Sequence, residues 1–277
     1  MPSHPARLQG VLKNELKQFL LKTAKIRRIH LIGCSRSGVT TLHYALIAFR
    51  NTLLFEKGIL PWSDPSLKTC WALWKDWRLG GEERFFVTKR HTNWWQPHFI
   101  SALANYARRY QVFIINVIRD PRDVLTSSHY ADSQQYDVSP KLWQNNAAAT
   151  RQLQKELAGY PHVMTIKYEE AILHSHKIER QLHEALGMHL RPELSAWSRL
   201  KQNLEEISAT GYAVPYLHKL RDFDRSAIAN WQHDTAKMKY VDFLLNKSEY
   251  RNRLTAFMAE HSYHHAEHRR ATFHLTA

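Results

Sequence analysis

The stretch that decides the fold lies between residues 27 and 42 and reads RRIHLIGCSRSGVTTL. Its first part is rich in β-branched and apolar residues, as a buried strand requires. Gly33 and Gly38 then bracket four small or polar residues, and apolar residues at helical spacing follow. The stretch therefore predicts a strand, a tight loop and the start of a helix.

The loop has the spacing of a phosphate-binding loop, G-x-x-x-x-G-[K]-[ST]. Such a loop points successive backbone N–H groups at an anion, and the following helix adds the positive end of its dipole. Val39 stands where the lysine belongs, which argues against ordinary ATP chemistry, and a cation lies inside the loop instead, as Arg36. A plain Gly/Ser turn is the alternative, but the context with Arg36 and Thr40 favours an anion site.

Composition points to one large α/β domain with an anionic partner. The chain has 277 residues, of which 44% are hydrophobic, and a formal net charge of +14. This charge is spread along the chain, which favours an anion-lined cleft over a disordered basic arm. Two cysteines, Cys34 and Cys70, make no disulfide framework and suggest a reducing compartment. We find no signal peptide or membrane span and expect a cytoplasmic protein.

The rest of the chain alternates between strand and helix patterns. Apolar runs predict strands at residues 85–89, 111–118 and 162–168, and helical spacing predicts helices at residues 11–24, 99–110, 140–158, 172–186, 192–207 and 236–261. In the first of these helices one side carries Val11, Leu12, Leu16, Phe19 and Leu20. This alternation predicts a three-layer α/β fold of the P-loop NTPase type, with a central, mainly parallel sheet flanked by helices.

Two further groups of polar residues follow predicted strands, where sites form in parallel sheets. Lys89 and His91 lie at the end of the strand predicted at 85–89, and a pair of solvated residues is the alternative interpretation. Arg119 follows the strand at 111–118, and Ser127, eight residues on, is placed two turns into the next helix. An arginine, a hydroxyl and a helix start make a second anion site. A ligand with two separated phosphate groups would fit both sites.

These motifs resemble those of PAPS-dependent sulfotransferases, in order, from Ile29 to Trp231. The run from Arg36 to Thr41 is similar to their 5′-phosphosulfate loop, and the run from Val117 to Ser127 to their 3′-phosphate motif. Lys89-Arg90-His91 resembles the K-T-H segment, with arginine in place of the middle threonine. Tyr168-Glu169 resembles the segment whose tyrosine approaches adenine. Arg225 and Trp231 stand where the family has its C-terminal loop, although the glycines of that loop are absent.

The resemblance implies one sulfotransferase domain over residues 1–277, with an N-terminal helix (1–25), a PAPS-binding core (27–231) and C-terminal helices (232–277). It implies His91 as the base, or an acidic residue as in some glycan-modifying members, and Lys89 as the group that stabilises the departing oxygen. It also implies sulfuryl transfer from PAPS, with PAP as product, to a hydroxyl or amine of a saccharide or small-molecule acceptor, without a metal. The implied cofactor-binding residues are Arg36, Ser37, Gly38, Val39, Thr40, Thr41, Arg119, Ser127, Tyr168 and Arg225.

Two other functions stay open at this point. A P-loop nucleotide kinase would require Mg²⁺-dependent ATP turnover, against which Val39 argues. A non-catalytic basic nucleic-acid-binding protein would bind DNA or RNA in a salt-sensitive way. We expect a small-molecule or glycan partner, no nucleic acid and no membrane span, and we leave a monomer and a homodimer open.

Overall fold

The computed structural model describes residues 4–23, 25–54, 70–71, 74–75, 84–91, 97–128, 135–191, 201, 205 and 224–263. Within these residues five strands form one sheet in the order β2-β3-β1-β4-β5, and every neighbouring pair is parallel. The strands are β1 (Ile26–Gly33), β2 (Thr52–Leu54), β3 (Arg84–His91), β4 (Phe113–Ile118) and β5 (Val163–Lys167). All six residues of β4 are buried, as a central strand requires.

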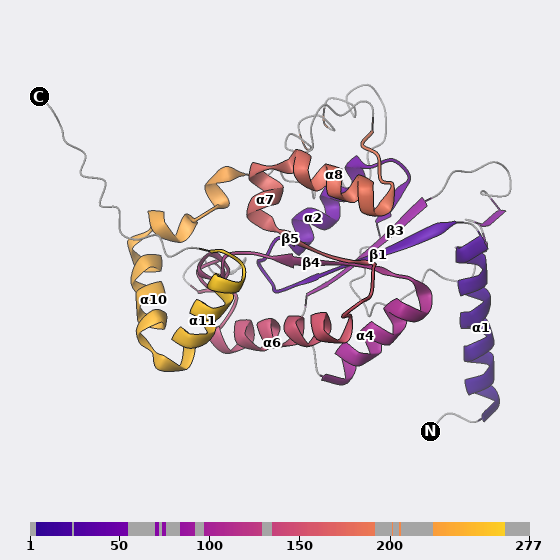
Figure 1. Cartoon of the computed structure of the whole chain (residues 1–277), viewed down its shortest axis with the longest axis horizontal. Coiled ribbons are helices and arrows are strands. Elements are labelled where there is room, and N and C mark those ends of the chain that lie inside the picture. Colours follow the sequence, from indigo (N-terminus) through magenta and orange to yellow (C-terminus); the bar gives the residue numbers. More distant parts are fainter. Residues whose placement is uncertain are drawn as a thin grey trace, which may run out of the picture.

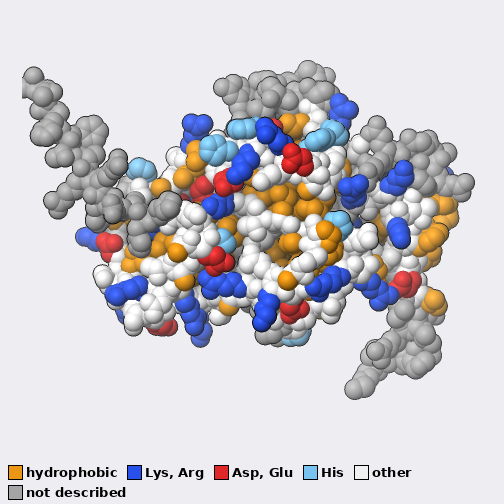
Figure 2. Space-filling model, in the orientation of Figure 1, with side chains coloured by type: hydrophobic (Ala, Val, Ile, Leu, Met, Phe, Trp, Pro, Cys, Tyr) orange, Lys and Arg blue, Asp and Glu red, His pale blue; other side chains and the backbone are white. Residues whose placement is uncertain are grey.

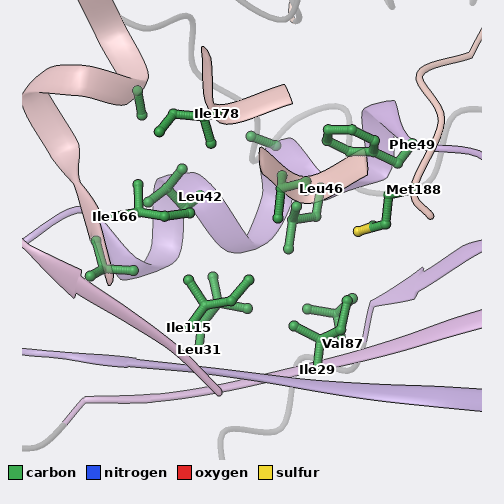
Figure 3. Packing of buried hydrophobic residues seen from close by; sticks show 14 of the residues in the cluster. Ile29, Leu31, Leu42, Leu46, Phe49, Val87, Ile115, Ile166, Ile178 and Met188 are labelled. Atoms are coloured by element: carbon green, nitrogen blue, oxygen red, sulfur yellow. The ribbon is translucent and has the colours of Figure 1, made fainter. Parts of the chain in front are cut away.

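Helices cover both faces of the sheet (Figure 1). One face packs against α2 (Val39–Ala45), α7 (Tyr168–Leu173) and α8 (Ser175–Leu186), and the other against α4 (Pro97–Tyr110) and α6 (Pro140–Glu156). Successive strand residues alternate between these layers, so Leu31 belongs to the first core and Ile32 to the second. Figure 3 shows the first core, where Leu31 and Ile115 from the sheet lie under Leu42.

The two ends of the chain extend this three-layer body. The helix α1 (His4–Thr23) leads into β1 at one end of the molecule (Figure 1). At the other end lie α5 (Pro121–Leu125), two 3₁₀ turns η5 (Arg225–Ala227) and η6 (Asn230–His233), and a pair of helices, α10 (Thr235–Asn246) and α11 (Ser248–Glu260). These two helices pack on α6 through a cluster that includes Trp143, Leu244 and Phe257. A further 3₁₀ turn, η1 (Leu46–Ala48), continues α2.

The predicted three-layer α/β class is confirmed, but several predicted elements differ from the structure. The first helix begins at His4 rather than at residue 11, and β3 continues to His91 instead of ending at residue 89. The predicted helix 172–186 is two helices that meet at His174, and the predicted helix 236–261 is interrupted at Lys247, whose backbone is extended. The short strand β2 is an additional element, which the sequence analysis does not predict. The predicted helix at 192–207 falls largely outside the described residues. In the described part of the chain, no helix combines the length and apolar character that a bilayer crossing needs.

Candidate functional site

The strand ends of β1, β3 and β4 meet at one edge of the sheet. Gly33, the last residue of β1, pairs with His91 of β3 on one side and with Val117 of β4 on the other. The loops that follow β1 and β4 therefore begin next to each other, as sites in parallel sheets require. The main chain of His91 lies in this edge, and its side chain is outside the described residues.

The loop after β1 can be made only with glycine at its two ends. A Cβ on Gly33 would lie 2.4 Å from the carbonyl oxygen of Val117 and 2.7 Å from the Ser37 hydroxyl. Gly38 has a φ of 94°, and a Cβ there would lie 2.1 Å from the Tyr168 ring. Residues that carry a Cβ rarely adopt that φ, and a Cβ here would overlap the Tyr168 ring. Both the backbone conformation and the packing therefore require glycine.

The remaining loop residues split between the core and a cavity. Ser37 is buried, and its hydroxyl donates to the carbonyl oxygen of Cys34 at 2.8 Å. Val39 is fully buried among the first core. Arg36 adopts a positive φ of 65°, and its Nε lies 2.9 Å from the Asp137 carboxylate, with a third of the side chain exposed. Val39, at the position where a P-loop has its lysine, is thus a core residue. The cation of this loop, Arg36, is paired with the Asp137 carboxylate.

A lysine from the neighbouring strand reaches the start of α2. The ammonium of Lys89 donates to the Thr40 hydroxyl at 3.0 Å and lies 4.9 Å from the centre of the Tyr44 ring. Because Val39 faces the core, Lys89 is the cation that comes nearest to this first turn of α2 among the contacts described. The first N–H groups of a helix have no partner within the helix, so positive potential gathers here.

Arg119 is fixed among several partners at the end of β4. Its guanidinium donates to the carbonyl oxygen of Arg36 at 3.0 Å and to that of Ala227, and lies 3.8 Å from the Asp123 carboxylate. It also lies 5.0 Å from the centre of the Tyr168 ring. With 12% of its side chain exposed, Arg119 links the two strand-end loops to the segment around residue 227.

Ser127 lies beyond α5, and the placement two turns into a helix is wrong. Asp120 caps α5 by accepting from the Arg122 N–H at 2.8 Å, and the helix ends at Leu125. The hydroxyls of Thr126 and Ser127 each bond a carbonyl oxygen of the preceding turn, at 2.7 Å. These bonds satisfy the last carbonyls of the short helix, so the chain leaves helical geometry. Ser127 still borders the cavity described below.

Tyr168 and Thr41 close the inner side of the loop. Tyr168 begins α7, is 7% exposed, and shares a side-chain hydrogen bond with Thr41. Burial raises the pKa of the Tyr168 hydroxyl, and the nearby Arg119 opposes that shift. The ring therefore stays neutral and fills the space between Gly38 and Arg119.

Most of these residues border a cavity of about 1170 Å³, but Ser37 and Lys89 are not part of its described lining. Lys89 reaches this lining through its contact with Thr40. Both strand-end loops and η5 and η6 contribute to its walls. The charged residues among its described lining are Arg36, Arg119, Lys201 and Lys237 on the positive side and Asp123, Asp137 and Asp224 on the negative side. Asp123 is buried and accepts from the N–H groups of Ala229 and Trp231, and burial raises the pKa of its carboxyl. The cavity can hold a ligand the size of a nucleotide.

Several lining residues were missed by sequence reasoning. Asp137, Asn230 and Lys237 all border the cavity, and Lys237 donates to the Asn230 side chain. Asp137 and Asn230 come from segments without a strand or helix pattern, so no local signal marks them, whereas Lys237 lies in the helix predicted at 236–261. Asp234 is the N-cap of α10, and Lys237 follows three residues later in the first turn of that helix. An aspartate at a helix start is a recognisable sequence signal, and it would have placed Lys237 near the beginning of α10.

The two residues matched to a C-terminal loop, Arg225 and Trp231, belong to a segment that borders the cavity, but neither is part of the described lining. Arg225 is exposed in η5 and does not belong to the described lining, whereas its neighbours Asp224 and Ser226 do. Trp231 packs its ring 4.6 Å from the Arg122 guanidinium. Both residues nevertheless stand in the segment that Arg119 and Asp123 hold against the sheet, so they help to shape one wall.

Cys34 and the histidines described here offer no metal site or reactive thiol. Burial raises the pKa of the Cys34 thiol to about 12, so the thiol stays protonated. Among the described residues no group of three or more His, Cys, Asp or Glu side chains could hold a metal ion. His261, His264, His265 and His268 would share one face of a C-terminal helix, but the last three of them lie outside the described residues.

Comparisons with known proteins give structural likeness without sequence matches. No protein-family profile matches the chain, and no curated protein sequence matches it. The sulfotransferase domain of the Synechococcus PCC 7002 olefin synthase is 14% identical over 76% of this chain and 88% of its own, with a TM-score of 0.47. The sulfotransferase domain of the curacin biosynthetic pathway is 16% identical over 79% and 97%, with a TM-score of 0.46. Mouse sulfotransferase SULT7A1, complexed with PAP, is 13% identical over 88% and 94%, with a TM-score of 0.45.

Proposed function

We propose that this chain is a PAPS-dependent sulfotransferase that moves a sulfuryl group to a hydroxyl or amine. The observation that carries the proposal is the contact of 3.0 Å between the Lys89 ammonium and the Thr40 hydroxyl. It brings a cation from β3 to the first turn of α2, while the usual lysine position, Val39, is buried in the core. A cation at that point supports transfer of an anionic group without the ATP-specific lysine.

The described lining fits an adenosine ligand with phosphates at both ends. PAPS bound in the cavity would supply the sulfuryl group as part of its 5′-phosphosulfate. The loop from Arg36 to Thr41 would hold the 5′ end through backbone N–H groups and the first turn of α2. Arg119 and Ser127, on the neighbouring loop, would hold the 3′-phosphate, and Tyr168 would border the nucleoside.

The residues near the reacting end have separate roles in this proposal. Lys89 stabilises the negative charge that grows on the bridging oxygen as its bond to sulfur breaks. His91 accepts the proton that the acceptor hydroxyl or amine loses as its new bond to sulfur forms. The position of the His91 main chain at the end of β3, beside Gly33, supports this role. The acceptor in this proposal is a saccharide or a small molecule, and the basic character of the chain supports one that is acidic.

The binding part of the proposal is tested by thermal shift with PAP, ADP and ATP. PAP should raise the melting temperature most, because it alone carries a 3′-phosphate for Arg119 and Ser127. Equal shifts by all three nucleotides would contradict the proposal. A strict Mg²⁺ requirement with ATP turnover would favour a kinase instead.

The catalytic part is tested by sulfuryl transfer from labelled PAPS to a panel of acceptors. Lys89→Met should lower the transfer rate about 10²–10³-fold while leaving the PAP-induced thermal shift in place. His91→Ala should lower it about 10²–10⁴-fold, again with PAP affinity retained. Lys141→Met, a change at an exposed position of α6, is the matched control. Full activity of the Lys89 and His91 variants would assign the chemistry to other residues.

A further inference from the structure

The helix α1 carries an apolar stripe that faces away from the protein. Leu12, Leu16 and Phe19 are 68%, 46% and 63% exposed, and their spacing of four and three residues puts them on one face. The opposite face carries Gln18 and Leu21, which are 8% and 2% exposed. The helix is thus amphipathic, but its larger described apolar stripe is turned outward rather than into the core.

The position of α1 leaves this stripe accessible. The helix stands at one end of the molecule, and its N-terminal half points away from the sheet (Figure 1). Leu20 and Leu21, near its C-terminal end, join the small cluster around Ile26, Cys70 and Phe86. Trp71, next to Cys70 in the chain, is 54% exposed, so a large aromatic side chain adds to the apolar surface at this end.

Positive charge flanks the stripe. Lys13 and Lys22 are exposed on either side of it, and Lys17 is half-buried next to Leu16. Glu15 is the single acidic residue of α1, and its carboxylate is paired with Arg109 of α4. Figure 2 shows hydrophobic side chains on this edge of the molecule with Lys and Arg side chains close by. No ion pair joins Lys13, Lys17 or Lys22 to an acid among the described residues, so the flank presents positive charge beside apolar side chains.

We propose that α1 docks this protein onto an anionic lipid bilayer. The helix lies flat at the headgroup level, with Leu12, Leu16 and Phe19 inserted and the flanking lysines directed toward lipid phosphates. An exposed apolar stripe between basic side chains is the pattern that binds such surfaces. A second copy of the chain fits less well, because it would bring Lys13 and Lys22 against the same lysines and carries the same net charge of +14.

Flotation of the full chain with lipid vesicles tests the role of the stripe. The protein should float with vesicles of phosphatidylcholine and phosphatidylserine, and stay behind with vesicles of phosphatidylcholine alone. Combined Leu12→Ser, Leu16→Ser and Phe19→Ser changes should lower the bound-to-free ratio about tenfold or more. Phe243→Ser, a change at a half-exposed phenylalanine of α10, should leave it unchanged and is the matched control.

The triple variant also distinguishes vesicle binding by the apolar stripe from vesicle binding by the net positive charge of the chain. Equal binding by the wild type and the triple variant would mean that charge alone attracts the chain to the vesicles, and would overturn the proposal. Failure of the wild type to float would overturn it as well. All three changes are at exposed positions, so the melting temperature should stay within about 2 °C of the wild type.

Two further measurements test whether something other than an anionic bilayer covers the apolar stripe of α1. Lys13→Glu with Lys22→Glu should weaken flotation while the stripe is intact, and added salt should do the same to the wild type. Light scattering without lipid should give the same mass for the wild type and the triple variant. A larger mass that the triple variant loses would assign the stripe to a second copy. Flotation that survives both lysine changes would contradict an anionic bilayer.

Discussion

The loop after β1 and the loop after β4 begin beside each other, yet they hold their arginines in different ways. Arg36 is one-third exposed and has one described side-chain partner, the Asp137 carboxylate. Arg119 is 12% exposed and contacts two carbonyl oxygens, a carboxylate and a ring. Arg36 can exchange its carboxylate partner for a ligand. The Arg119 guanidinium is already held in one orientation, and its contacts also join three segments of the fold.

The two arginines should therefore differ in the free energy that an anion gains by binding to them. A ligand at Arg36 must compete with Asp137, which weakens binding but leaves the fold unchanged. A ligand at Arg119 finds the guanidinium already oriented, so it gains the full interaction. Substitutions in the two loops should therefore differ in how they divide between stability and affinity.

The largest effect is expected for Gly38→Ala in the first loop. The new methyl group would overlap the Tyr168 ring at a φ of 94°, so we expect a loss of about 3 kcal/mol of unfolding free energy. Gly159→Ala is the control, because its φ is also positive, at 74°, but nothing lies within 4 Å of the added atom. It should cost about 1 kcal/mol. Urea unfolding measures both, and equal losses would mean that the ring moves away freely.

Arg119→Ala should combine a stability loss with a binding loss. Removing the guanidinium leaves the carbonyl oxygens of Arg36 and Ala227 without this donor and the buried Asp123 without its cation, which should cost about 2 kcal/mol. Arg36→Ala should cost about 0.5 kcal/mol, because its ion pair is partly exposed. Calorimetric titration should show that Arg119→Ala weakens PAP binding more than ADP binding. The same loss for both nucleotides would argue against a 3′-phosphate contact.

The strands beneath the two loops should differ in their response to acid. Burial lowers the pKa of His30 in β1 from 6.5 to about 3, with Arg90 and His43 adding to the shift, whereas the buried polar residue of β4 is Asn116, which does not titrate. Because the unfolded chain binds the proton first, stability should fall as the pH drops from 6.5 toward 3, by about 1 kcal/mol per pH unit.

Unfolding free energies between pH 7.5 and 5.5 measure this slope. His30→Gln should flatten it, and His98→Gln, at an exposed position of α4, should leave it as in the wild type. A slope that does not change in the His30 variant would assign the acid sensitivity to other groups.

The smallest effect is expected for Asp137→Asn. This change removes the partly exposed ion pair to Arg36 without opening a cavity, so it should cost no more than about 0.5 kcal/mol, the loss expected for Arg36→Ala. The affinity for PAP should rise about two- to threefold, since the ligand no longer displaces a carboxylate. Weaker PAP binding in this variant would mean that Asp137 orients Arg36 for the ligand instead of competing with it.

The sequence reveals the parts of the site that have local patterns. The run from Ile29 to Thr41 combines a buried strand, two glycines and a helix start, and each of these has a short-range physical cause. Arg119 could be placed for the same reason, since it follows the most apolar strand of the chain. Lys89 could be placed at a strand end, but its contact with Thr40 depends on the pairing of β3 with β1.

Other features depend on packing between distant segments. Asp137 and Lys237 reach the cavity because two later segments of the chain fold back to it. The periodicity of apolar residues in the sequence does not predict such a return. The breaks at His174 and Lys247 occur without glycine or proline, so tertiary contacts decide them. The outward stripe of α1 has the same spacing as a buried one, and the sequence alone gives no basis for choosing between the two.

The walls of the cavity come from parts of the chain almost two hundred residues apart, the loop around Arg36 and the turns around Asn230. During synthesis the first wall leaves the ribosome long before the second, and the sheet can assemble in the interval. A nascent chain that ends before residue 224 would lack η5, η6 and the carbonyl of Ala227 that Arg119 contacts. If the cavity binds a nucleotide as we propose, a nascent chain should acquire that ability only after the segment from residue 224 onward has been synthesised and has packed against Arg119.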